Sequence, residues 1–91
     1  MAKTDPHEGL NGAIIQTIAA LLDEHDLTPT EAARKAGVAT SNFHRALNYE
    51  RAINLADITQ IAGVFGLRTS ELLGRAETRL WNRDRHAQDD T

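Results

Sequence analysis

Residues 28–37 constrain the fold of this chain more than any other stretch, because they contain both of the signals that delimit a helix. Thr28 can cap a helix with its hydroxyl, Pro29 suits the first helical position, and Glu31 stands where a capping box needs a carboxylate. Gly37 follows and can adopt the left-handed conformation that ends many helices. The sequence therefore predicts a short helix that starts after Thr28 and stops at Gly37.

A second short helix is predicted over residues 40–47, directly after the turn. Phe43, Ala46 and Leu47 recur at spacings of three and four residues, so they share one face of this helix. Alanines at positions 33 and 36 allow the two helices to approach closely, and Gly37 permits a sharp reversal between them. With Phe43 and Ala46 against a core, polar side chains are left on the opposite face: Thr40, Ser41, His44 and Arg45.

Three further helices are predicted around this pair. Apolar residues at helical spacing run from Leu10 to about residue 25, Asn54 caps a helix that ends at Gly66, and Thr69 begins a helix that reaches about Trp81. A chain of 91 residues suffices for one hydrophobic core. We expect a compact all-α domain of five helices over residues 10–81, with a loosely ordered arm, residues 1–9, and a polar tail, residues 82–91.

Composition and charge restrict the possible compartment and partners of the protein. There is no cysteine, which excludes disulfides and thiolate chemistry, and no apolar run is long enough to span a membrane. We expect a soluble cytoplasmic protein. The net charge of −3 argues against a nucleic-acid partner, but the charge is unevenly distributed. Residues 1–26 carry one lysine against five acids, whereas residues 27–51 carry four cationic side chains against two carboxylates.

Two stretches of the chain resemble the lambda-repressor-like family, which includes Cro and the phage repressors. They are residues 27–48, LTPTEAARKAGVATSNFHRALN, and residues 55–73, LADITQIAGVFGLRTSELL. The resemblance implies a five-helix, lambda-repressor-like DNA-binding domain in which the second and third helices form a helix-turn-helix motif. The third helix would then lie in the major groove of double-stranded DNA, with its first residues nearest the base edges.

The resemblance also implies roles for individual side chains. Together with the predicted exposed face of the third helix, the resemblance indicates four base-reading residues: Thr40, Ser41, His44 and Arg45. Six further residues are expected to contact the phosphate backbone and set the register on the duplex: Thr28, Thr30, Lys35, Asn42, Asn48 and Arg51. Of the base readers, Arg45 would discriminate most strongly, because arginine can make a bidentate contact to guanine. Arg34 and Lys35 are equally compatible with a solvated helix face.

Four apolar residues in the fifth helix are compatible with two roles. Leu73, Ala76, Leu80 and Trp81 can complete the core of the monomer or form a stripe for a second chain. We favour a homodimer through this helix, since two recognition helices one DNA turn apart are a common route to adequate affinity and a lone tryptophan suits an interface.

No catalytic or metal-binding constellation is evident. Ser41 and His44 lie three residues apart on an exposed helix without an orienting carboxylate, and the four histidines are scattered. We expect no enzymatic activity, no cofactor, no metal and no small-molecule ligand. The sequence favours a transcriptional repressor that occupies a short palindromic site as a dimer. The alternative is a protein-interaction module of the same fold, such as an antitoxin, antirepressor or adaptor, which the overall negative charge favours.

Overall fold

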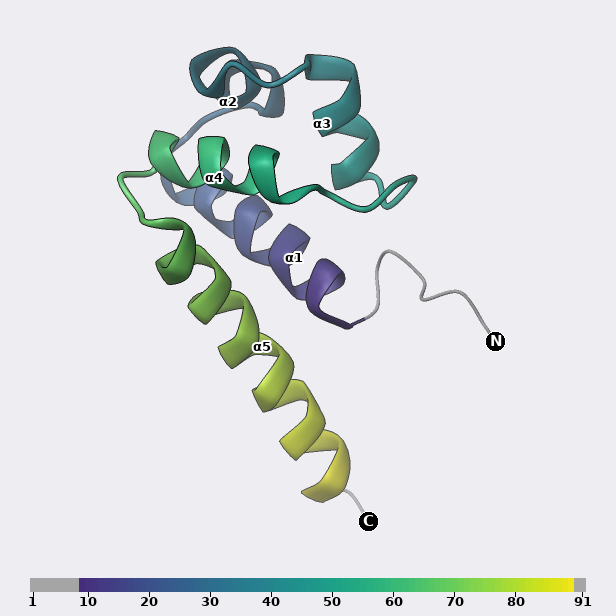
Figure 1. The fold of residues 1–91 in the computed structure, drawn as a ribbon. Coiled ribbons are helices and arrows are strands. Elements are labelled where there is room, and N and C mark those ends of the chain that lie inside the picture. Colours follow the sequence, from purple (N-terminus) through teal and green to yellow (C-terminus); the bar gives the residue numbers. More distant parts are fainter. Residues whose placement is uncertain (1–8, 90–91) are drawn as a thin grey trace.

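Five α-helices make up the computed structural model, which describes the backbone of residues 9–89 and the side chains of residues 9–82. In chain order they are α1 (Gly9–Glu24), α2 (Pro29–Ala36), α3 (Thr40–Leu47), α4 (Leu55–Val64) and α5 (Thr69–Asp89). No strand occurs in this part of the chain. The short pair α2 and α3 lies at one end of the molecule, and α5 extends away from it (Figure 1). The prediction of a five-helix, all-α fold is confirmed.

The start of α2 is held by the predicted capping box. The Thr28 hydroxyl accepts a hydrogen bond from the backbone N–H of Glu31 at 3.2 Å, and the Glu31 carboxylate accepts one from the backbone N–H of Thr28 at 3.0 Å. This second bond favours the ionised carboxylate and lowers the pKa of Glu31 below its usual value. Asn54 caps α4 in a similar way, with its side-chain oxygen 2.8 Å from the backbone nitrogen of Asp57.

The first four helices end in the same geometry. A residue with a positive φ stands one or two positions after the last residue of each helix. The backbone N–H of the residue that follows it donates to the carbonyl five residues before the donor, at 2.9 Å in all four cases. The positive-φ residues are Asp26, Gly37, Tyr49 and Gly66. The glycines adopt this conformation at no steric cost, whereas Asp26 and Tyr49 are exceptions that the sequence did not reveal.

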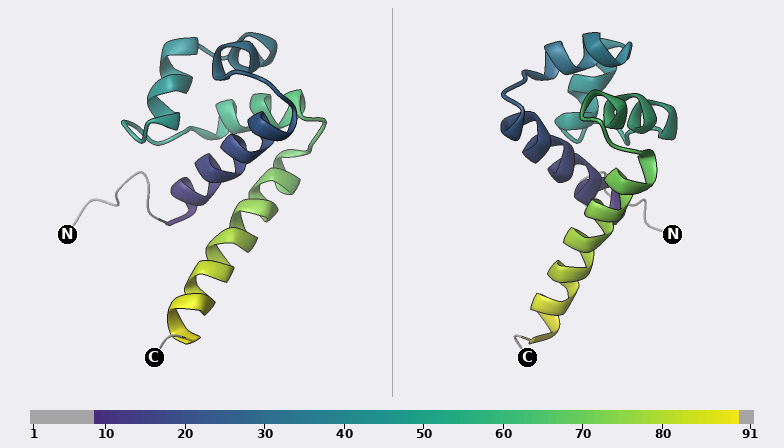
Figure 2. Two further views of the ribbon diagram at one scale, coloured as in Figure 1. Left: turned by 180° about the vertical axis from the view of Figure 1, so that it is seen from behind. Right: turned by 90° about the vertical axis from the view of Figure 1, so that its left-hand side faces the viewer.

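One hydrophobic core joins all five helices. α5 packs mainly against α1, and α2 packs against both α3 and α4 (Figure 2). The largest side chains with almost no exposed surface are Phe43, Ile18, Ile61, Leu72 and Thr17. The Thr17 hydroxyl donates to the Ala13 carbonyl at 2.8 Å, so this buried polar group is satisfied within α1.

Helix α5 is longer than predicted. We expected regular structure to be lost after about Trp81, yet the helix continues to Asp89, because residues 82–89 contain neither glycine nor proline. The molecule measures 44 × 29 × 20 Å. The predicted arm lies outside the described residues apart from Gly9, which begins α1. Within the described residues, no helix is both long and apolar enough to cross a bilayer.

Candidate nucleic-acid interface

Helix α3 is anchored to the core by one side. Phe43 is 1% exposed and Ala46 is 2% exposed, and Val38 in the turn between α2 and α3 is also buried. α3 has only eight residues and its N-cap residue, Ala39, makes no side-chain capping bond. A helix this short is not stable alone. Its orientation therefore depends on the burial of Phe43 and Ala46.

The opposite side of α3 presents Ser41 and Arg45. Successive residues of an α-helix are separated by about 100° around the axis, so the residues two before and two after Phe43 both point away from it. Ser41 and Arg45 occupy these two positions, and both are exposed. Thr40 is half-buried in the first turn. The structure thus brings three of the four predicted base readers to the outer side and first turn of α3.

His44 lies on the flank of α3 that faces α2. Its Nε2 atom is 3.1 Å from the hydroxyl oxygen of Thr30, a residue of α2 fourteen positions earlier in the chain. Both side chains are partly buried. A predicted base reader and a predicted phosphate contact are therefore hydrogen-bonded to each other, a pairing that links the two helices of the motif.

Asn42 lies on the other flank of α3. Its side-chain oxygen accepts a hydrogen bond from Nη1 of Arg51 at 3.0 Å, and Arg51 belongs to the loop after α3. The same loop is fixed from the opposite direction, because the backbone N–H of Ile53 donates to the Asn11 side chain of α1 at 3.1 Å. Asn48, at the C-terminal cap of α3, is exposed. Three predicted phosphate contacts thus cluster around the end of α3.

Helix α2 presents its two cations in different directions. Arg34 is four residues after Thr30, so both lie on the side of α2 that faces His44. Lys35 lies about 140° around the helix from Thr30 and shares its side with Glu31. Both cations and Thr28 are exposed. We predicted a phosphate contact for Lys35 and left Arg34 open, although its spacing from Thr30 is the signal that places it beside α3.

The predicted dimer residues of α5 fall into three environments. Ala76 has no exposed surface and is part of the monomer core, so it has none to offer a second chain. Leu73 and Leu80 are partly buried against that core. Trp81 is 63% exposed. Of these four residues, Trp81 therefore offers the largest exposed apolar surface, with Leu73 and Leu80 beside the core.

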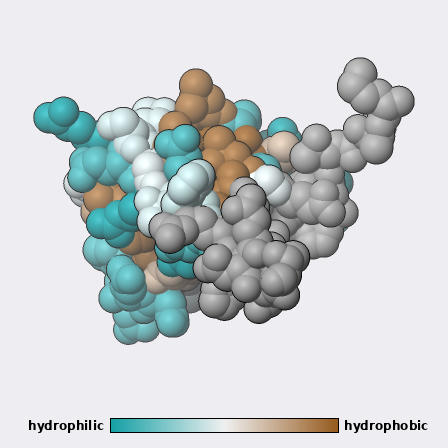
Figure 3. Space-filling model, turned by 90° about the horizontal axis from the view of Figure 1, so that it is seen from below, coloured by the Kyte–Doolittle hydropathy of each residue, from teal (hydrophilic) through white to brown (hydrophobic). Residues whose placement is uncertain are grey.

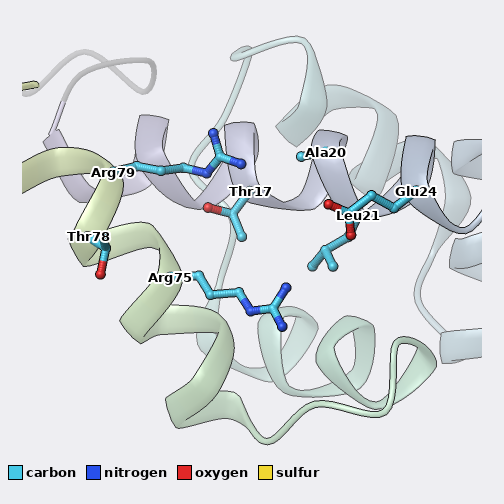
Figure 4. A pocket seen from close by; sticks show the side chains of 7 residues that line it. All are labelled: Thr17, Ala20, Leu21, Glu24, Arg75, Thr78 and Arg79. Carbon is cyan, nitrogen blue, oxygen red and sulfur yellow. The ribbon is translucent and has the colours of Figure 1, made fainter. Parts of the chain in front are cut away.

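Two hollows lie away from the outer side of α3. A groove of about 310 Å³ between α1 and α5 is lined by side chains from both helices, and the Arg75 and Arg79 side chains extend into it from α5 (Figure 4). A second hollow at the end of α1 is lined in part by Asp23, Asp26 and Thr28.

Apolar surface is also visible outside these hollows. Apolar atoms gather in one region of the face seen from below in Figure 3, with hydrophilic side chains beside it. Among the described residues, three expose large apolar side chains: Leu10, Leu55 and Trp81.

The chain matches the model of a known protein family. The model of the BetR domain family matches residues 10–87, which includes every helix described above apart from the first residue of α1 and the last residues of α5. BetR domains are small helical DNA-binding domains with a helix-turn-helix-like fold. No curated protein and no solved structure matches the chain.

Proposed function

Because the chain belongs to the BetR domain family, a family of DNA-binding domains, we propose that it is a sequence-specific transcription regulator that inserts α3 into the major groove. The proposed arrangement is lambda-repressor-like, with α2 across the backbone and α3 between the two strands. The observation that supports it best is the outward presentation of Ser41 and Arg45 by a helix whose opposite side is buried through Phe43.

Base reading is assigned to the exposed side and first turn of α3. Within the described residues the Arg45 side chain has no hydrogen-bond or ion-pair partner, and its backbone carbonyl accepts from the N–H of Glu50. The five donors of its guanidinium are therefore available to a guanine edge. Ser41, one turn earlier, and Thr40 can each donate to or accept from a base. His44 was predicted with this group. The bond to Thr30 gives it a different role from that of the other three residues.

Register on the duplex is assigned to the residues around α3. Asn42, Asn48 and Arg51 lie at its flank and C-terminal end, and Thr30 and Arg34 lie on the adjacent side of α2. Lys35 completes the proposed set from another side of α2, whereas the hydroxyl of Thr28, predicted with it, is engaged in the cap of this helix. Such contacts orient the protein without choosing a sequence.

We propose a homodimer that represses by occupying a palindromic site. Residues 27–51, which include α2 and α3, carry four cationic side chains, so a single motif is expected to bind weakly at physiological salt. Trp81, with Leu73 and Leu80, supplies the apolar contact in α5. In such a dimer the two copies of α3 would be about 34–36 Å apart, one turn of DNA.

A salt titration tests DNA binding directly. A duplex obtained by selection from randomised sequences is labelled, and its affinity is measured by fluorescence anisotropy at several salt concentrations. If Arg34, Lys35 and Arg51 each neutralise a phosphate, while Arg45 contacts a base, log K falls with log salt at a slope of about −2.7 for one copy and about −5.4 for two. Failure to select any preferred sequence, or a slope near zero, contradicts the proposal.

A protein-interaction module is the second candidate, and the charge supports it. The net charge is −3, and Asp23, Glu24 and Asp26 are all exposed at the end of α1. An acidic surface suits a basic protein partner better than a polyanion. The same titration separates the two candidates, because a module of this kind shows no salt-dependent affinity for duplex DNA.

A further inference from the structure

The hydrogen bond between Thr30 and His44 bears on how the proposed interface contacts the DNA backbone. The Thr30 hydroxyl oxygen and His44 Nε2 are 3.1 Å apart, and each residue comes from a different helix of the motif. Each side chain keeps part of its surface exposed at the edge of that interface. The bond therefore lies where an approaching DNA backbone would meet it.

The direction of this bond depends on which atom holds the proton. A threonine hydroxyl has one hydrogen and can donate only once, whereas a neutral imidazole carries its hydrogen on one of two ring nitrogens. With the hydrogen on Nδ1, His44 Nε2 accepts from Thr30, and the hydroxyl has no hydrogen left for another partner. With the hydrogen on Nε2, His44 donates to the Thr30 oxygen, and the hydroxyl hydrogen is free to point elsewhere.

A DNA phosphate selects between these two directions. Phosphate oxygens accept hydrogen bonds and do not donate them, so Thr30 can bind a phosphate only as the donor. That leaves the Thr30 oxygen to accept from His44, which requires the hydrogen on Nε2. Because the nitrogen that carries the hydrogen is set by the partner, binding of DNA and the tautomer of His44 are coupled.

We propose that His44 is a positioning residue that directs the Thr30 hydroxyl hydrogen to a DNA phosphate and does not itself read a base. The proposal rests on the proposed DNA-binding function. It assigns His44 to the phosphate contacts of α2 and leaves base reading to Thr40, Ser41 and Arg45.

Nitrogen NMR of the full chain tests the proposal. The protein is labelled with ¹⁵N-histidine and studied at a pH of about 8, where an ordinary imidazole is neutral. His44 is assigned by the signals that disappear in His44→Gln. On addition of the selected duplex, we expect the His44 Nε2 resonance to shift to the range of a nitrogen that carries hydrogen. The other three histidines provide an internal reference.

Variants of Thr30 supply the matched controls. Thr30→Val keeps the shape and removes the hydroxyl, so the shift should disappear and affinity should fall about 3-fold to 10-fold, the effect of one hydrogen bond. Thr30→Ser should retain both. Thr30→Val and His44→Ala combined should bind no more weakly than the weaker single variant, because both changes remove the same contact.

Failure of this inference is distinguishable from failure of the proposed function. Tight, sequence-selective binding without a change of the His44 Nε2 resonance overturns the positioning role of His44 and leaves the proposed DNA binding intact. A His44 variant that changes the selected sequence, while Thr30→Val does not, shows direct base reading and also overturns it. Absence of binding by the unmodified protein overturns the proposed function first. The NMR measurement uses the native chain, so a variant that fails to fold does not block the test.

Discussion

Removal of the Arg45 side chain gives the sharpest test of base reading, because the fold does not depend on it. Arg45 is exposed and lies opposite Phe43, and within the described residues its side chain forms no hydrogen bond or ion pair. Alanine is also the most favourable residue within a helix. We therefore expect Arg45→Ala to change the free energy of unfolding by less than about 0.5 kcal/mol.

The expected loss of affinity follows from the geometry of the contact. A bidentate arginine–guanine pair contributes about 1–3 kcal/mol of discrimination, which corresponds to a loss of roughly 5-fold to 160-fold on the selected duplex. On a scrambled duplex the same side chain makes only non-specific contacts with phosphates, so the loss should be smaller. The ratio of the two affinities should consequently fall.

Fluorescence anisotropy with selected and scrambled duplexes at one salt concentration measures both losses. Arg34→Ala is the matched control, since it removes an equally charged and exposed side chain from α2. It should weaken binding to both duplexes by the same factor and keep their ratio. Equal losses for Arg45→Ala on the two duplexes, with unchanged thermal unfolding, would refute base reading by this residue.

Three further predictions concern the fold and the assembly. Gly37→Ala should destabilise the domain by about 1–2 kcal/mol because the φ of Gly37 is +73°. Gly63→Ala should stabilise it by up to about 1 kcal/mol, because Gly63 lies within α4 and a methyl group added there meets no atom within 4 Å. Equal changes in the free energy of unfolding for the two variants, measured with denaturant, would contradict this. Thr28→Ala should cost about 1 kcal/mol and lower Tm by roughly 4–8 °C, while Thr28→Ser should not. Trp81→Ala should weaken dimerisation in sedimentation, whereas Leu55→Ala, which removes an equally exposed apolar side chain outside α5, should leave it unchanged.

Helix positions could be predicted well where a local signal exists. The capping box at Thr28 and the cap at Asn54 each involve residues three positions apart, so both the signal and its structural effect are local. Gly37 and Gly66 likewise indicate where their helices end. Tyr49 gives no such signal. It adopts a positive φ without being glycine or asparagine, because its half-buried side chain packs against the core and the tertiary contact outweighs the local cost.

Which side chains of α3 face the core and which face outward was predictable from the sequence, but the side-chain pairs between helices were not. Periodicity places Phe43 inside and Arg45 outside, since both belong to one helix. The bond between Thr30 and His44 depends on the angle and distance between two helices, which packing decides. For the same reason Ala76 could not be assigned between core and interface until the contact of α5 with α1 was known.

The acidic end of α1 limits where DNA can approach α2. Asp23 and Asp26 line a hollow together with Thr28, so a phosphate placed at Thr28 would lie near two carboxylates and be repelled. The Thr28 hydroxyl is also engaged in the cap of α2. Toward the other end of α2, Arg34 attracts phosphate and shares its side with Thr30. Among these residues, the charge pattern therefore favours Thr30 and Arg34 for the backbone contact and leaves Thr28 chiefly to stability, so Thr28→Ala should lower Tm more than it lowers the affinity of the folded protein for DNA.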